Sequence, residues 1–275
     1  MTFLPTCLRT KKRTCVAYVV LVFIAIYSTG VIACEPLTFT VAVDVGHTTR
    51  TPGATSARGV PEFEFNRILA NKIVSTLKED GFAKTYLING DGRIDSLIER
   101  CHQAENGGAD LFLSIHHDSV QPHYLKTWTV RGKPAYYCDQ FSGYSLFVSS
   151  KNQQFAQSQH AAFEIGKALH SRGLTPTLHH AEQIKGENRT LLNTIFGIYL
   201  FDDLIVLKRS SVPAVLLEAG IIINRNDELT LSDLGSQQLF ADSISAAVTA
   251  LCHQEQDEEV GNLKMSSMGK GQIGF

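Results

Sequence analysis

The sequence lacks the features of a nucleic-acid-binding protein. It has no internal repeat and no cluster of lysine and arginine in its main body. The chain has 25 basic and 27 acidic residues, and residues 1–34 contain four basic residues and no acid. The rest of the chain therefore carries a net charge of −6. Because binding to phosphates requires clustered positive charge, we expect no nucleic-acid partner.

Cysteine is too scattered for a zinc–cysteine site. None of the six cysteines belongs to a C-x-x-C pair, the spacing that such sites commonly use. Cys101, Cys138 and Cys252 lie beyond residue 34. In an oxidising compartment these three residues permit one disulfide and leave one thiol, and the sequence does not indicate which pair forms.

The first 34 residues have the pattern of an export signal. Basic residues precede the apolar run VAYVVLVFIAIY (16–27), and small residues follow in STGVIAC (28–34). This order is typical of a cleaved signal peptide. Two alternatives stay open, because the apolar run could remain as a membrane anchor, or VIAC could be a lipoprotein signal in which Cys34 is lipidated. We expect an exported protein of the periplasm or cell envelope, attached to the membrane if Cys34 carries a lipid.

Apolar strand patterns alternate with amphipathic helical patterns beyond residue 34. The predicted strands are residues 39–46, 83–89, 110–117, 144–150 and 213–220, and the predicted helices are 62–81, 93–106, 152–172, 196–209 and 234–252. This alternation predicts an α/β fold with a twisted, mostly parallel sheet flanked by helices on both faces. We expect a single domain over residues 35–252. The polar residues 253–275 are expected to be disordered.

Side chains that can bind a metal stand at the ends of three predicted strands. His47 follows the first strand, His116 ends the third, and Glu218 ends the strand at 213–220. Ligands of open parallel sheets bind at the carboxyl ends of the strands, so these residues should share one edge. Glu62, in the first turn of the helix after the first strand, can reach the same edge.

Two histidines and a glutamate form a known catalytic zinc set, and a further carboxylate can act as a general base. Each residue also has an ordinary explanation. A histidine at a strand end is commonly a hydrogen-bonded surface residue, and Glu62 is a favourable acid at a helix N-terminus. Glu218 is harder to explain, because a carboxylate beside a buried strand needs a partner. No compact H-E-x-x-H motif is present, so the residues alone leave a zinc hydrolase open.

Four segments together resemble the zinc-dependent N-acetylmuramoyl-L-alanine amidases of the type-3 family. They are VAVDVGHTT, GVPEFEFN, LFLSIHHD and VPAVLLEAGIIIN, and the resemblance spans about residues 38–250. It implies a single catalytic domain that hydrolyses the amide bond between N-acetylmuramic acid and L-alanine in peptidoglycan, in cell wall remodelling or turnover. Peptidoglycan would be the substrate, and Zn²⁺ the cofactor.

The resemblance also implies roles for individual residues. His47, Glu62 and His116 match the three zinc ligands of the family, and Glu218 matches its catalytic glutamate. Glu64 is a nearby competitor for the role of Glu62, but the spacing to the residues that follow favours Glu62.

Other residues match supporting positions or depart from the family. Arg100 matches an arginine that we interpret as structural. Asp44 and Asp118 could orient the ligand histidines, although a backbone or capping role explains each equally well. His117 stands where the family usually has a small residue.

Two segments, residues 119–143 and 174–189, are longer than a minimal family member needs. Each connects to an element that ends at the active-site edge, so we expect both on that side. The aromatic residues of the first segment could stack on a sugar or stem peptide, or pack the segment itself; they are Tyr124, Trp128, Tyr136 and Tyr137. In the second segment, His179, His180 and Glu182 could approach the zinc or be ordinary surface residues.

Two rival functions stay open. A zinc peptidase that cuts within stem peptides could use the same metal set, and only its products distinguish it. A non-catalytic peptidoglycan-binding module would lack a ligand or Glu218, and none of these is missing here. No separate wall-binding repeat is visible, so a regulatory protein partner also stays open.

Overall fold

The computed structural model describes residues 36–269, with side chains up to residue 253. The predicted export signal, including Cys34, lies outside the described residues. Within the described part of the chain, no helix has both the length and the apolar character needed to cross a bilayer.

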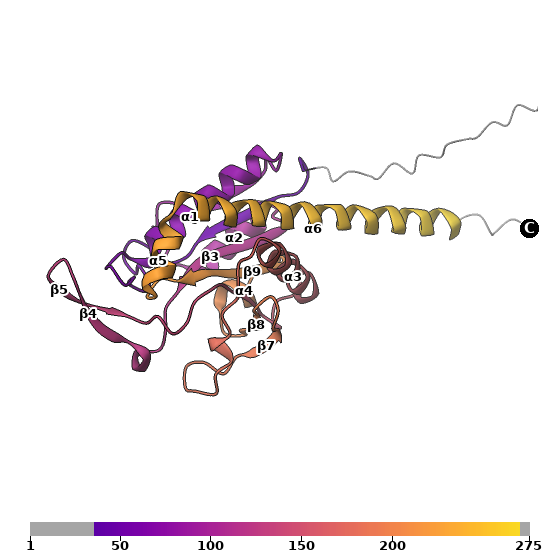
Figure 1. Ribbon diagram of the computed structural model, residues 1–275. Helices are drawn as coiled ribbons and strands as arrows, with labels where there is room; N and C mark the ends of the chain where they lie inside the picture. Colours follow the sequence, from indigo (N-terminus) through magenta and orange to yellow (C-terminus); the bar gives the residue numbers. More distant parts are fainter. Residues whose placement is uncertain (1–35, 270–275) are drawn as a thin grey trace, which may run out of the picture. The chain divides into compact units, whose positions relative to one another are not determined.

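Seven strands of the described chain form one mixed sheet, in the order β2-β1-β3-β9-β6-β8-β7 (Figure 1). Their bounds are β1 Val41–Val45, β2 Tyr86–Ile88, β3 Leu111–Asp118, β6 Ser145–Val148, β7 Thr190–Asn193, β8 Ile198–Leu200 and β9 Ala214–Ile221. Neighbours from β2 to β9 are parallel, as are β6 and β8. The pairs β6–β9 and β7–β8 are antiparallel. The prediction of a mostly parallel sheet is therefore confirmed.

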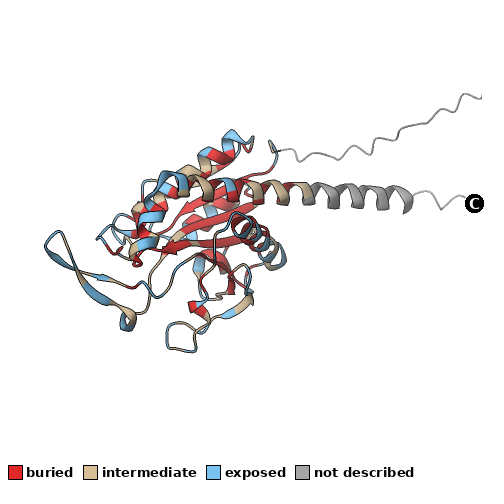
Figure 2. Cartoon of the chain, in the orientation of Figure 1, coloured by how far each residue is buried: buried red, intermediate tan, exposed pale blue. Residues whose placement is uncertain are grey.

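Helices cover both faces of this sheet. They are α1 Glu62–Glu79, α2 Leu97–Asn106, α3 Phe155–Ser171, α4 Ile205–Lys208, α5 Arg225–Ser232 and α6 Leu234–Gly269. Because side chains alternate along a strand, odd-numbered residues of β1 and β3 pack with α1, α3 and α6, and even-numbered residues pack with α2 and α4. Figure 2 shows the central strands as the most buried part of the fold.

The structure corrects one predicted element and adds detail in two other segments. Residues 196–209, predicted as one helix, contain strand β8 and only the short helix α4. The segment 119–143 contains an antiparallel hairpin of β4 Lys126–Val130 and β5 Lys133–Tyr137. Helix α6 continues to Gly269, into the segment for which disorder was expected.

Cys101, Cys138 and Cys252 do not form a disulfide with one another. Cys101 and Cys138 are buried free thiols, whereas Cys252 is disulfide-bonded. Burial raises the pKa of Cys101 to about 12, which keeps this thiol protonated and unreactive.

Candidate active site

The three predicted metal ligands lie together at the carboxyl ends of β1 and β3. One donor atom each from His47, Glu62 and His116 lies within 4.8 Å of the others. His47 Nε2 is 3.0 Å from Glu62 Oε2, and His116 Nδ1 is 3.1 Å from Glu62 Oε1. Glu64 instead forms an ion pair with Arg67 on α1. Glu62 is therefore the carboxylate that faces both histidines.

Glu62 is oriented by hydrogen bonds from several segments. Asn66 Nδ2 and the backbone N–H of His117 donate to Oε1 at 3.1 and 3.3 Å. The backbone N–H of Ala54 donates to Oε2 at 3.0 Å. Burial alone would raise the pKa of Glu62, but hydrogen bonds to His116 and His47 hold it well below its usual range. The side chain is thus a fixed, ionised carboxylate.

The backbone of the site has features that the sequence prediction missed. His47 has a φ of 67°, a left-handed conformation that is uncommon outside glycine. Asn89 Nδ2 and Arg100 Nη2 donate to its carbonyl oxygen at 2.7 and 2.6 Å and hold this turn. A Cβ at Gly46 would collide with the His116 ring, and one at Gly53 would collide with Glu62. Glycine at both positions therefore lets the three ligands converge.

Glu218 lies beside this group on β9. The sheet register pairs it with His116 on β3 and with Ser145 on β6. Its Oε2 atom is buried and has no hydrogen-bond partner among the described residues. Burial first, and then the charges of Asp118 and Glu62, raise its pKa well above the usual value. A carboxyl group with these properties is suited to exchanging protons.

Asp44 does not orient the ligand histidines. It accepts a hydrogen bond from Ser114 Oγ at 2.8 Å and contacts Arg100 Nη1 at 3.3 Å. Burial raises the pKa of Asp44, and the Arg100 guanidinium opposes that rise. Arg100 is itself buried and also donates to the carbonyl oxygens of Val45 and Ile94. These contacts agree with the structural role expected for Arg100, and its guanidinium group is the charged partner of Asp44.

Asp118 contacts histidines other than those expected. Its Oδ2 atom is 3.3 Å from His179 Nε2 and 2.9 Å from His180 Nε2. His179 and His180 are only 4% and 6% exposed, so they are not ordinary surface residues. Glu182, which was considered with them, instead accepts a hydrogen bond from Tyr124. Burial lowers the pKa of His180, but Asp118 and Glu187 outweigh it and raise the value to about 9.

A pocket of about 410 Å³ joins these residues. Its lining includes His47, His116, Asp118, His180 and Glu218. Residues 119–121, 186, 187 and 189 also line it, so both long segments reach this side, as expected.

The aromatic residues of the first long segment pack mainly within the protein. Tyr124 contacts Phe141 edge to face, and Trp128 contacts Tyr137 in the same way. Tyr136 is 58% exposed. Of the two explanations left open by the sequence, packing of the segment itself therefore accounts for Tyr124, Trp128 and Tyr137.

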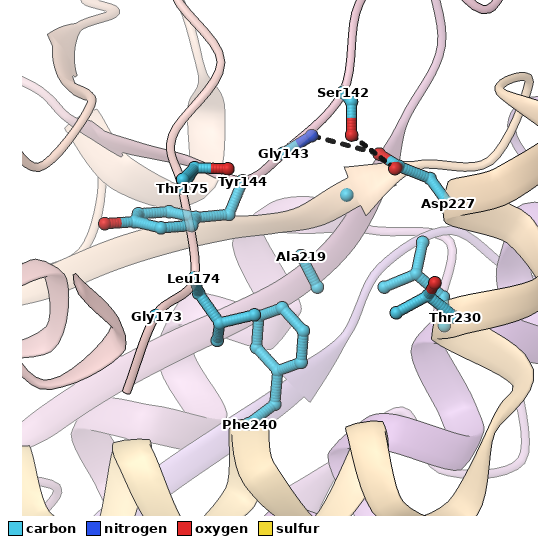
Figure 3. Close-up of a pocket in the computed structure, with 12 residues that line it drawn as sticks. Ser142, Gly143, Tyr144, Gly173, Leu174, Thr175, Ala219, Asp227, Thr230 and Phe240 are labelled. Atoms are coloured by element: carbon cyan, nitrogen blue, oxygen red, sulfur yellow. Dashed lines mark hydrogen bonds between the residues drawn. The ribbon is translucent and has the colours of Figure 1, made fainter. Parts of the chain in front are cut away.

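Another pocket, shown in Figure 3, has an apolar lining that includes Tyr144, Leu174 and Phe240. At its rim Asp227 accepts hydrogen bonds from Ser142 Oγ and from the backbone N–H of Gly143. These bonds attach α5 to the segment that precedes β6. No residue of this lining belongs to the histidine–carboxylate groups described above.

Comparison with known proteins identifies the family to which this chain belongs. A model of the N-acetylmuramoyl-L-alanine amidase family matches residues 41–250. The chain belongs to this amidase family. The resemblance noted in the sequence is therefore confirmed for the family, and the members of this amidase family are hydrolases.

Individual relatives agree with this amidase assignment. The N-acetylmuramoyl-L-alanine amidase AmiC of Escherichia coli is 25% identical over 229 residues, which cover 76% of this chain and 52% of AmiC. The chain thus spans about half the length of that relative. The catalytic domain of the amidase CwlV from Bacillus (Paenibacillus) polymyxa is 25% identical, with a TM-score of 0.57 and coverage of 77% and 97%. Ami1 of Mycobacterium smegmatis shares the fold, with a TM-score of 0.61, 18% identity and coverage of 79% and 98%.

Proposed function

We propose that this chain is a zinc-dependent N-acetylmuramoyl-L-alanine amidase that cleaves peptidoglycan during cell wall remodelling or turnover. One observation carries the proposal. In a chain of the amidase family, the donor atoms of His47, Glu62 and His116 converge within 4.8 Å, and the pairing of β3 with β9 places Glu218 beside His116.

The donor set fits a catalytic zinc ion. Two imidazole nitrogens and one carboxylate oxygen are a known ligand set that leaves a further position for water or substrate. The hydrogen bonds from Asn66, His117 and Ala54 orient the Glu62 carboxylate, as commonly happens for metal ligands. A zinc ion held by these residues would supply Lewis-acid polarisation of the scissile carbonyl and would lower the pKa of water toward neutrality.

Glu218 is the proposed general base. It accepts a proton from the attacking water and returns it to the leaving amine, so that the C–N bond breaks. The products are a carboxylate on the muramic acid and a free amine on L-alanine. The buried Oε2 atom has no competing partner in the described part of the chain, which supports this role. Burial and the charges of Asp118 and Glu62 raise the pKa of Glu218, and a zinc ion held by His47, Glu62 and His116 would oppose that rise.

Removal of the metal should abolish hydrolysis reversibly. After dialysis against a zinc chelator, the protein should no longer release soluble fragments from purified peptidoglycan. Without the metal, no Lewis acid polarises the scissile carbonyl group. Added Zn²⁺ should restore the rate, whereas Mg²⁺ should not, since nitrogen ligands suit zinc. The assay is the release of fragments, with zinc content measured on the same samples. Full activity in a sample shown to be free of zinc would contradict the proposal.

We also propose that the protein acts outside the cytoplasm, in the periplasm or cell envelope. The support is the basic and apolar pattern of residues 1–34, together with a proposed substrate that belongs to the cell wall. N-terminal sequencing of the protein from its native envelope should find a chain that begins near Cys34 or Glu35. A native protein that still begins at Met1 would contradict cleavage.

A further inference from the structure

A second group of metal-binding side chains opens onto the active-site pocket. Asp118, His179 and His180 each offer one donor atom, and these atoms lie within 4.8 Å of one another. Asp118 and His180 line the same pocket as His47 and His116. We propose that Asp118, His179 and His180 bind a second zinc ion, separate from the one at His47, Glu62 and His116.

The donor atoms of this second group are buried and lack hydrogen bonds. Asp118 Oδ2, His179 Nε2 and His180 Nε2 are all inaccessible, and none has a hydrogen-bond partner in the described chain. Both nitrogens lie close to Oδ2, at 3.3 and 2.9 Å, but the geometry is not that of a hydrogen bond. Buried polar atoms rarely remain unpaired. A cation bound among them would complete their bonding, because each of the three can donate a lone pair.

The other polar atoms of both histidines already have partners. His179 Nδ1 is 2.9 Å from Thr177 Oγ1, and His180 Nδ1 is 2.8 Å from Glu187 Oε2. A metal-bound histidine almost always donates its second ring N–H to such a group, which fixes its tautomer. A proton on Nδ1 leaves the Nε2 lone pair of each ring available for a metal.

Aromatic packing fixes the positions of the two rings. Phe141 stacks on His179 with ring centroids 5.0 Å apart. Phe147 and Tyr199 each contact His180 in an edge-to-face arrangement. The two imidazole centroids are 3.9 Å apart.

The chemistry of the group selects the class of metal. Two imidazole nitrogens and one carboxylate oxygen suit zinc and related transition metals better than Mg²⁺ or Ca²⁺, which prefer oxygen ligands. Asp118 and His180 also line the active-site pocket, so a metal ion held by this group would lie beside that pocket. The second site does not depend on amidase activity, because bound metal is counted without any substrate, but the expected total of two includes the ion proposed at His47, Glu62 and His116.

Metal counting in matched variants tests the inference. The purified protein is loaded with Zn²⁺, dialysed to remove weakly bound metal and measured by mass spectrometry for zinc. We expect about two zinc ions per chain in the wild type, and about one in His180→Ala and in His116→Ala. The double variant should hold none. His102→Ala is the matched control, since His102 is an exposed histidine on α2, and it should hold about two.

The zinc counts can also overturn the second site. One zinc ion in the wild type and in His180→Ala, with none in His116→Ala, would overturn the second site and leave the first. Anomalous diffraction at the zinc edge from wild-type crystals needs no variant and covers the case in which His180→Ala fails to fold. It should show a peak among Asp118, His179 and His180, and a peak at His116 alone would overturn the inference.

Discussion

The Glu218→Gln variant is expected to hydrolyse peptidoglycan at least one hundred times more slowly than the wild type, with its fold and metal retained. Glutamine has nearly the shape of glutamate but cannot take a proton from water. General base catalysis typically contributes about 10²–10⁴-fold to a rate. Because Glu218 Oε2 has no hydrogen bond within the described residues, the substitution breaks none there. The measurements are the rate of fragment release, the zinc content and the circular dichroism spectrum.

Glu64→Gln is the control for this variant. The chemical change is the same, but Glu64 pairs with Arg67 on the partly exposed surface of α1. Its rate should stay close to that of the wild type. Near-normal turnover by Glu218→Gln would mean that another residue is the base, and Glu187, which lines the same pocket, would be the first to test.

Arg100→Met is expected to lower the free energy of unfolding by about 3–5 kcal/mol, the usual cost of removing one partner from a buried ion pair. Arg100 is 2% exposed, and the carboxylate of its partner Asp44 is fully buried. The variant would also leave the carbonyl oxygens of Val45 and Ile94 without this donor. The turn at His47 would lose a support as well, so activity should fall with stability. Urea unfolding monitored by circular dichroism measures the change.

Arg93→Met is the matched control for Arg100→Met. Arg93 pairs with Asp91 at 3.7 Å, and both side chains are mostly exposed. Exposed ion pairs contribute about 0–1 kcal/mol, so this variant should unfold almost as the wild type does. Equal effects of the two substitutions would show that the buried pair does not hold the β1 end in place.

The proximity of His47, Glu62 and His116 could be predicted from the order of the strands, whereas their roles as metal ligands came from the family resemblance and are proposed here. His47 and His116 follow or end apolar strands, and parallel neighbours bring such positions to one edge. Glu62 could be placed because Pro61 precedes it, and α1 begins at Glu62. Short apolar runs and turn residues are visible in the sequence without knowledge of any long-range contact.

The contacts of Asp118 could not be predicted in the same way. Its partners His179 and His180 come from a short 3₁₀ helix, His179–Ala181, in a long connecting segment. No periodic pattern places such a segment against β3. Strand β8 was missed for a related reason, since three residues are too short for a pattern and their pairing with β6 stabilises them. The left-handed turn at His47 likewise depends on distant donors from Asn89 and Arg100.

The bond that is cut tests the central claim most directly. Purified muropeptides with intact stem peptides are digested with the mature wild-type protein, and the products are identified by mass spectrometry, with Glu218→Gln as the blank. We predict intact stem peptides with a free amine on L-alanine and uncut glycan that carries a free muramic acid carboxylate. Products cut within the stem peptide, with the bond from muramic acid to L-alanine intact, would contradict the amidase proposal and indicate a zinc peptidase.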